Sequence, residues 1–314
     1  MSNLRDAMGL CISYGNENSQ YQTEFEPASG TIWGYFNPRH SACFSLGLLN
    51  DIAAHDEALA RNAGQIEWEG SLYRANHYVL ASRTPRVFNM GGDLALFAML
   101  IKAQDRQAIA HYAKLCIDNL HRRIDNFCSP TLTTISLVQG DALGGGFEAA
   151  LTSDVIVAEE SAQMGLPEIL FNLFPGMGAC SLLARRIGMR AAEELILSGK
   201  ILSAAELHRL GVVDVVATDG QGETAVRNWI AKNAKRRNGM QAVFRARQFI
   251  HPVTRAELDG IVELWVDAAL RLGERDLKMM NRLVRAQMKR MESAQQPAAG
   301  EEMALPLAEP CIAA

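Results

Sequence analysis

The sequence predicts an α/β fold, and three observations lead to that prediction. Short runs rich in β-branched and aromatic residues, such as Thr31–Phe36 and His77–Ser82, alternate with longer segments in which apolar residues recur at helical spacing. Turns that contain glycine or proline separate these runs. Residues 236–292 keep to the helical spacing. We therefore expect βαβ units with a largely covered sheet, followed by a C-terminal helical region.

The composition is that of a globular protein with a sizeable core, because 48% of the 314 residues are apolar and 21% are charged. A net charge of −4 argues against a general affinity for nucleic acid. The longest apolar run, Leu94–Ile101, is too short to span a bilayer, and the polar N-terminus has no signal-peptide core. We therefore expect a cytoplasmic protein with no membrane insertion.

Cysteine and histidine are scattered along the chain. The six cysteines have no C-x-x-C spacing, and the seven histidines form no H-x-x-x-H or H-E-x-x-H pair. Metal sites normally need closer pairs of ligands. We therefore expect reduced, mostly buried thiols and no metal site.

The first elements are expected in the order strand, helix, hairpin, strand. Residues 1–29 are polar and fit either a loose arm or an edge hairpin. After the strand Thr31–Phe36, Ser45–Ala60 carries leucines at helical spacing and should pack on that strand. Residues 61–76 fit a hairpin or a surface insertion, and His77–Ser82 is the next strand.

Two glycine-rich turns follow, each ahead of a helix. Phe88–Asp93 precedes an apolar helix, with Asp93 at the expected N-cap. The strand Thr131–Val138 leads into Gly140–Gly146, whose spacing matches neither phosphate-loop pattern. Bare amides at a helix N-terminus bind anions, including an oxygen that becomes negative only during a reaction. For the first turn, the alternative is a plain connection between strand and helix.

Two glutamates lie in apolar surroundings. Glu148 falls in the first turn of the helix after Gly146, and Glu168 follows Pro167. Each has an ordinary explanation, because acids favour helix N-termini and Pro-Glu is a common helix start. Buried carboxylates also acquire raised pKa values that suit general acid–base catalysis. From spacing alone, the structural and the catalytic interpretations both remain open.

Together these motifs resemble the crotonase (enoyl-CoA hydratase/isomerase) superfamily, from about Thr31 to Ala234. The matching segments are Phe88–Asp93, Gly140–Glu148, Asp154–Ala158, Gly165–Glu168, Pro175–Gly178, Leu197–Ala204 and Gly211–Asp214. The resemblance implies a crotonase-like spiral of ββα repeats with a C-terminal helical region, in an assembly of three or six copies. In that arrangement residues 30–235 form the spiral core and 236–292 the helical region. Residues 1–29 are then an N-terminal arm, and the Ala/Pro/Glu-rich residues 293–314 are expected to form a disordered tail.

The resemblance also assigns roles to four residues. The amides of Gly92 and Gly145 match the oxyanion-hole donors that hold a thioester carbonyl oxygen. Glu148 and Glu168 match the two catalytic carboxylates. By analogy with hydratases, Glu168 removes the proton from the α-carbon and Glu148 protonates the departing 3-hydroxyl, although either could activate water in a hydrolytic step.

Within the superfamily, the chain is most similar to the bacterial diffusible signal factor synthases (Rpf-type). The similarity is carried by the insertion at 61–76, by Tyr73–Tyr78, by Gln163–Glu168 and by the aromatic residues of Phe171–Gly176. It implies that the protein dehydrates a 3-hydroxyacyl group on acyl carrier protein to the cis-2-enoyl thioester. Hydrolysis then releases an unsaturated fatty-acid quorum-sensing signal. No cofactor is implied beyond the phosphopantetheine of the carrier or of CoA.

Two other functions stay open. One is a conventional enoyl-CoA hydratase or isomerase acting on CoA thioesters, and the other is a crotonase-fold protein that binds a signal sensor or another partner. Basic residues late in the chain form either a docking surface for acidic acyl carrier protein or a solvated helix face. They are Lys232, Lys235, Arg236, Arg237, Arg245, Arg247, Arg282, Arg285, Lys289 and Arg290. The candidate acyl-pocket residues, which plain core packing would also explain, are Met164, Leu170, Phe171, Leu173 and Met177.

Overall fold

The computed structural model describes residues 19–295. Residues 1–18 of the expected arm and 296–314 of the expected tail lie outside the described residues. The elements, in order, are β1 (Tyr21–Glu26), β2 (Thr31–Phe36), α1 (Leu46–Arg61), β3 (Gln65–Trp68), β4 (Ser71–Arg74), β5 (His77–Ser82), β6 (Val87–Asn89), α2 (Leu94–Lys102), α3 (Arg106–Ile124), η1 (Asn126–Cys128), β7 (Thr133–Val138), β8 (Asp141–Leu143), α4 (Gly145–Leu151), β9 (Val155–Glu159), β10 (Gln163–Gly165), η2 (Pro167–Phe171), α5 (Ala179–Ile187), α6 (Met189–Ser198), β11 (Ile201–Ser203), α7 (Ala204–Arg209), β12 (Val215–Ala217), α8 (Gly222–Asn233), η3 (Ala234–Arg236), α9 (Arg237–Ile250), α10 (Arg255–Leu270) and α11 (Glu274–Gln295).

Two sheets run through the molecule. The larger has the order β1-β2-β5-β7-β9-β12, and all its neighbours are parallel except the antiparallel edge pair β1–β2. The smaller has the order β11-β10-β8-β6, in which β6, β8 and β10 are parallel. Each turn of the chain adds one strand to each sheet and then a helix, as β5-β6-α2, β7-β8-α4 and β9-β10-η2 do. This is the predicted spiral of ββα repeats, and the α/β fold class is confirmed.

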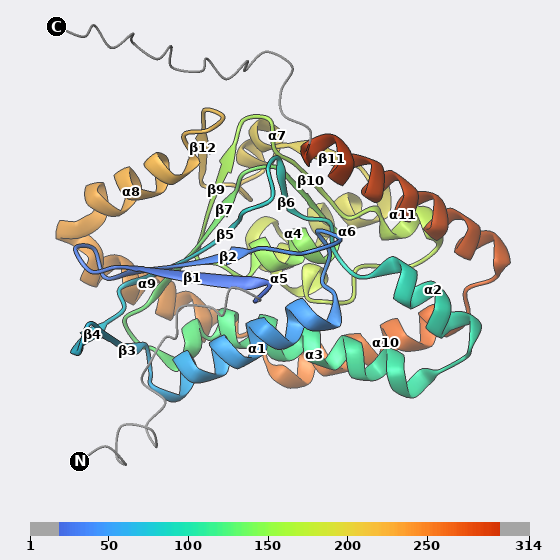
Figure 1. The fold of residues 1–314 in the computed structure, drawn as a ribbon, viewed down its shortest axis with the longest axis horizontal. Coiled ribbons are helices and arrows are strands. Elements are labelled where there is room, and N and C mark those ends of the chain that lie inside the picture. Colours follow the sequence, from blue (N-terminus) through green and yellow to red (C-terminus); the bar gives the residue numbers. More distant parts are fainter. Residues whose placement is uncertain (1–18, 296–314) are drawn as a thin grey trace, which may run out of the picture.

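Helices cover both faces of the larger sheet. Helices α1, α3 and α10 lie together on one side, and α8 lies on the other (Figure 1). Successive side chains of a strand point to opposite faces of the sheet. Tyr78 and Leu80 of β5 join the core under α1 and α3, whereas Val79 and Ala81 join the core under α8. The central strands β2, β5, β7 and β9 are therefore buried along their whole length, as expected for parallel strands covered on both faces.

The C-terminal helical region returns to the spiral. Helix α10 packs on α3, and α11 packs on α2 and η2 (Figure 1). Both helices thus reach the side of the molecule where the smaller sheet ends in its glycine turns. Among residues 19–295, no helix is both long enough and apolar enough to cross a membrane.

Several predicted elements keep their bounds, and others are shifted, such as β7, which begins at Thr133 and not at Thr131. The strands β2 and β5 have the predicted limits, and β3–β4 is the hairpin expected in 61–76. The valine-rich run Val212–Val216 also predicts a strand, but β12 begins only at Val215. The amides of Val212 and Val213 donate to the carbonyl of Leu207 at the end of α7, so these two residues close the helix instead of extending the sheet.

Candidate active site

The two glycine turns meet at one edge of the smaller sheet. Strands β6 and β8 are parallel neighbours, so the turns that leave them come out side by side. A Cβ atom placed on Gly145 would lie 3.5 Å from the amide nitrogen of Gly92. Both residues line one cavity of about 450 Å³, counted to its open mouth. Gly145 begins α4, where the first amides have no acceptor within the helix. The pair can therefore donate two hydrogen bonds to one oxygen.

Close packing of the backbone explains why these positions are glycines. A Cβ on Gly146 would lie 2.0 Å from the carbonyl oxygen of Asn89, so no side chain fits there. Gly144 has a φ of +51°, which L residues rarely adopt, and a Cβ there would lie 2.4 Å from Oε1 of Glu168. The first turn is held by Asn89, whose Oδ1 accepts a hydrogen bond of 2.8 Å from the amide of Gly91.

Glu148 is buried in the first turn of α4 with a fixed orientation. Its Oε1 accepts hydrogen bonds from the amides of Met177, at 2.8 Å, and Ala179, at 3.0 Å, where α5 begins. Burial raises the pKa of Glu148 to about 7, and the two amides oppose that rise because they stabilise the ionised form. The carboxyl group is therefore able to carry or release a proton near neutral pH.

Glu168 lies in η2 with its carboxyl group turned inward. The residue as a whole is partly exposed, but its Oε2 is buried and has no hydrogen-bond partner among the described residues. Burial and the nearby charge of Glu148 raise the pKa of Glu168 to about 8. Two amides stabilise the ionised form of Glu148, but within the residues that the structure describes no such donors contact Oε2 of Glu168. A proton shared by the pair therefore binds preferentially to Glu168.

The structure thus brings all four predicted residues to one cavity: Gly92, Gly145, Glu148 and Glu168. Two carboxyl groups with raised pKa values hold roughly one proton between them near neutral pH, so that one can accept a proton while the other donates. Two amides beside them can stabilise a negative oxygen. This arrangement suits proton removal next to a carbonyl group.

The predicted acyl-pocket residues separate into three groups. Phe171, Leu173 and Met177 line the cavity of the glutamates. Leu170 is 52% exposed and lines an adjoining outer cavity of about 670 Å³. Met164 is fully buried in the main hydrophobic core and lies in the wall of neither cavity.

Other residues of the cavity wall were not predicted as site residues, and they come from helices α2, α3 and α10 and from two loops. They are Phe44, Leu94, Phe97, Tyr112, Cys116, Gly176 and Trp265. Trp265 lies in the predicted C-terminal helical region, where an apolar stripe is typical of core or interface packing, and its indole explains Gly176, where a Cβ would lie 2.4 Å from Trp265 Cγ. That close approach is the structural signal that places α10 at the site.

The described part of the chain contains no cluster of three or more His, Cys, Asp or Glu side chains that could hold a metal ion.

Residues 73–294 match the sequence profile of the enoyl-CoA hydratase/isomerase family. The mitochondrial methylglutaconyl-CoA hydratase of Mus musculus is 33% identical over 152 residues, which are 48% of this chain and 45% of the relative. A peroxisomal fatty acid beta-oxidation multifunctional protein of Arabidopsis thaliana is 32% identical over 142 residues, 45% of this chain and 19% of the relative. The matched segments span between 19 and 50% of the length of the curated relatives.

Solved structures match over nearly their whole length. DspI of Pseudomonas aeruginosa superposes with a TM-score of 0.63 at 25% identity, covering 82% of this chain and 98% of DspI. An enoyl-CoA hydratase of Bacillus halodurans superposes with a TM-score of 0.65 at 19% identity, covering 88% of this chain and 100% of the hydratase. At 19% identity the second similarity establishes the fold alone.

Proposed function

Because the chain belongs to the enoyl-CoA hydratase/isomerase family, we propose that it acts on the thioester of a 3-hydroxyacyl group carried by acyl carrier protein. It dehydrates that group to the cis-2-enoyl thioester and then hydrolyses the thioester, which releases an unsaturated fatty-acid signal. The observation that carries the proposal is the cavity shared by the amides of Gly92 and Gly145 and the carboxyls of Glu148 and Glu168.

The dehydration follows from this geometry. The thioester oxygen lies between the two amides, and Glu168 removes a proton from the α-carbon. The electron pair forms an enolate whose negative oxygen the amides stabilise, and loss of one such donor typically lowers the rate on the order of 10²–10³-fold. The electron pair then returns to form the double bond and expels the 3-hydroxyl, which takes a proton from Glu148 and leaves as water.

In the hydrolytic step the same two amides hold the oxygen that becomes negative when water attacks the carbonyl carbon. One glutamate takes the proton of the attacking water, and the carbon–sulfur bond breaks. The thiol of the phosphopantetheine leaves with a proton, and the free fatty acid remains.

The placement of the proton favours a second candidate function for the same site. The amides of Met177 and Ala179 favour the ionised form of Glu148, so the shared proton of the free protein lies on Glu168. Hydration of an enoyl-CoA begins from that state, with Glu148 as base for water and Glu168 as acid at the α-carbon. Dehydration needs the proton on Glu148, so in our proposal it crosses between the carboxyls before the reaction.

The outer cavity suits the carrier arm. It connects Gly92 and Glu168 to Leu283 and Ala286 of α11, and Arg282 and Arg285 are exposed on that helix. These arginines neighbour Leu283 and Ala286 along α11, and we propose that they dock the acidic carrier protein. In contrast, Arg236 and Arg237 lie at the start of α9, on the opposite side of the chain from α11 (Figure 1).

The assembly is a further part of the proposal. Val243, Phe249 and Ile250 of α9 are 66, 88 and 69% exposed, and such large exposed apolar side chains mark interaction surfaces. We expect them to be covered in a homotrimer or hexamer, and light scattering after size-exclusion chromatography measures the number of copies. A signal sensor is the other partner expected.

The function is tested with matched 3-hydroxyacyl-acyl carrier protein and 3-hydroxyacyl-CoA, and mass spectrometry of the products. We expect free cis-2-enoic acid from the carrier substrate, and no enoyl product from Glu148→Gln or Glu168→Gln. Reversible hydration of enoyl-CoA without free acid would instead support the conventional hydratase. If the double glutamine variant keeps its partner and its effect in cells, the protein acts by binding.

A further inference from the structure

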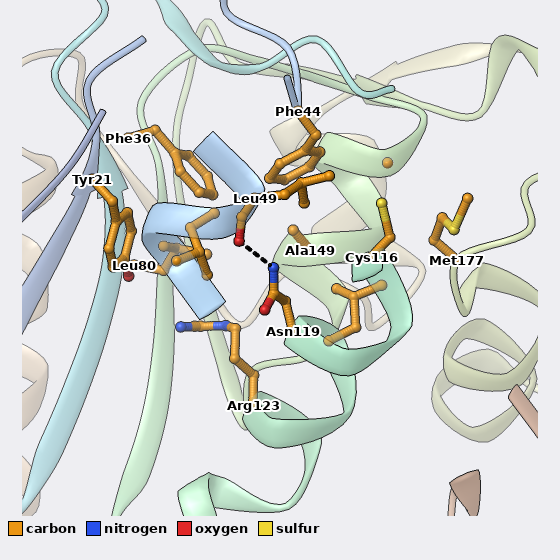
Figure 2. Close-up of a pocket in the computed structure, with 13 residues that line it drawn as sticks. Tyr21, Phe36, Phe44, Leu49, Leu80, Cys116, Asn119, Arg123, Ala149 and Met177 are labelled. Carbon is orange, nitrogen blue, oxygen red and sulfur yellow. Dashed lines mark hydrogen bonds between the residues drawn. The ribbon is translucent and has the colours of Figure 1, made fainter. Parts of the chain in front are cut away.

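A second cavity, of about 450 Å³ counted to its open side, is drawn with its lining residues in Figure 2. Most of its wall is apolar and comes from β1, β2, α1 and α3. It shares four lining residues with the cavity of the glutamates: Phe44, Cys116, Gly145 and Met177. The two cavities therefore adjoin at Gly145, with these four residues in the walls of both.

The far end of this cavity is polar. Figure 2 shows Tyr21 and Arg123 at the end away from Cys116 and Met177. Arg123 is 3% exposed, and its Nε and Nη2 donate hydrogen bonds of 3.3 Å to the hydroxyls of Thr152 and Ser153. Its Nη1 has no hydrogen-bond partner among the described residues. The cavity thus ends at a fixed, buried guanidinium group.

Other contacts hold that end in place. The guanidinium of Arg123 lies 5.0 Å from the ring centre of Tyr78, a cation–π contact. The hydroxyls of Tyr78 and Tyr21 share a hydrogen bond, and Tyr78 also contacts Nδ1 of His55 at 3.4 Å. At the side of the cavity, Nδ2 of Asn119 donates to the carbonyl of Leu49 at 3.0 Å (Figure 2).

The unfilled space along this cavity is small, and its wall is almost wholly apolar. Interiors are normally close-packed, and unfilled volume lowers stability. Apolar cavities also stay dry, so water does not fill them, but apolar ligands do. A ligand whose reacting carbonyl lies at Gly145 would have its apolar end in this space.

We propose that the second cavity binds the distal part of the acyl chain, and that the Arg123 end sets the longest chain accepted. The inference rests on the proposed function, which places a thioester at Gly92 and Gly145. Within the cavity, each added methylene is transferred from water to an apolar wall, which raises kcat/KM by about fourfold. A longer chain would press carbon atoms against the unpaired Nη1 of Arg123, which offers them no favourable contact.

The test is the chain-length profile of kcat/KM, measured with a series of saturated 3-hydroxyacyl thioesters on one carrier. We expect a steady rise with length and then a sharp fall. Leu49→Phe, which fills the cavity, should move the fall to shorter chains, and Leu49→Ala or Arg123→Met should move it to longer ones. Leu59→Phe is the matched control, because Leu59 lies on the same helix and is equally buried but is not in the cavity wall. Its profile should equal that of the wild type.

A binding measurement separates this inference from the proposed function. Calorimetric titration with free saturated fatty acids should give the same length limit, shifted in the same direction by Leu49→Phe. If no thioester is turned over but this binding pattern holds, the proposed function fails and the acyl-chain cavity stands. If thioesters are turned over with a length profile that Leu49→Phe and Leu49→Ala leave unchanged, the cavity does not hold the chain.

Discussion

Replacement of Glu168 by glutamine should change stability in a strongly pH-dependent way. The carboxyl of Glu168 is buried without a partner for Oε2, and its pKa is raised from the usual 4.5 to about 8. In the unfolded chain the same group ionises near 4.5. The wild-type protein therefore loses stability as pH rises from about 4.5 to about 8, because the folded state must either retain the proton or bury the charge.

The size of the effect follows from this difference. Each pKa unit corresponds to about 1.4 kcal/mol, so between pH 5 and pH 9 the wild type loses about 4 kcal/mol at this residue. Glutamine does not ionise, so Glu168→Gln lacks this loss. Its buried amide costs about 1–3 kcal/mol if it finds no acceptor, but that cost is the same at both pH values. The variant should thus be equal to or less stable than the wild type at pH 5 and more stable at pH 9.

Urea denaturation at pH 5 and at pH 9, followed by circular dichroism, measures both free energies of unfolding. Glu160→Gln is the control, because Glu160 is exposed and should give the same difference at the two pH values. The reasoning is refuted if the difference between wild type and Glu168→Gln is also the same at pH 5 and pH 9.

Three further predictions concern activity and structure. The pH profile of kcat/KM should be bell-shaped with a maximum between about 7 and 8, because one carboxyl of the pair Glu148 and Glu168 must be ionised and the other protonated; a flat profile from pH 6 to pH 9 would contradict this. Gly144→Ala should destabilise the fold by about 1–3 kcal/mol and displace Glu168, with a loss of activity seen in steady-state assays that exceeds the loss of folded protein. Asp154→Ala should lower the free energy of unfolding in urea by about 1–3 kcal/mol, because the buried carboxylate of Asp154 accepts bonds from Asn126 and Thr134, whose donors would be left without that acceptor.

The candidate reacting groups could be identified from local sequence, whereas their roles came from the resemblance to the crotonase superfamily. A glycine run at the start of a helix leaves amides bare, and an acid one turn later lies next to them, whatever the rest of the chain does. The strands Thr31–Phe36 and His77–Ser82 were predicted with their observed bounds. Each is rich in β-branched and aromatic residues, and a turn at each end sets its limits. The N-cap at Asp93 is confirmed by its 3.0 Å hydrogen bond from the amide of Leu96.

Spacing along the chain could not predict which distant segments meet. Trp265 reaches the cavity only because α10 packs on α3, and the stripe that carries it looks like any buried helix face. Met164, with an equally apolar neighbourhood in sequence, lies in the core instead. Apolar periodicity states that a side chain is buried, but not what it is buried against.

The second cavity is the clearest case of this limit. Tyr21, Leu49 and Arg123 come from β1, α1 and α3, and none of these segments carries a motif that indicates a binding site. Whether these side chains fill the space between the sheet and the helices depends on how far apart the sheet and the helices lie. Many packing contacts together set that distance. Local residues therefore specify the reacting groups, because amides and acids act over a few ångströms of neighbouring chain. The space that receives the rest of a substrate exists only once the sheets and helices have packed together.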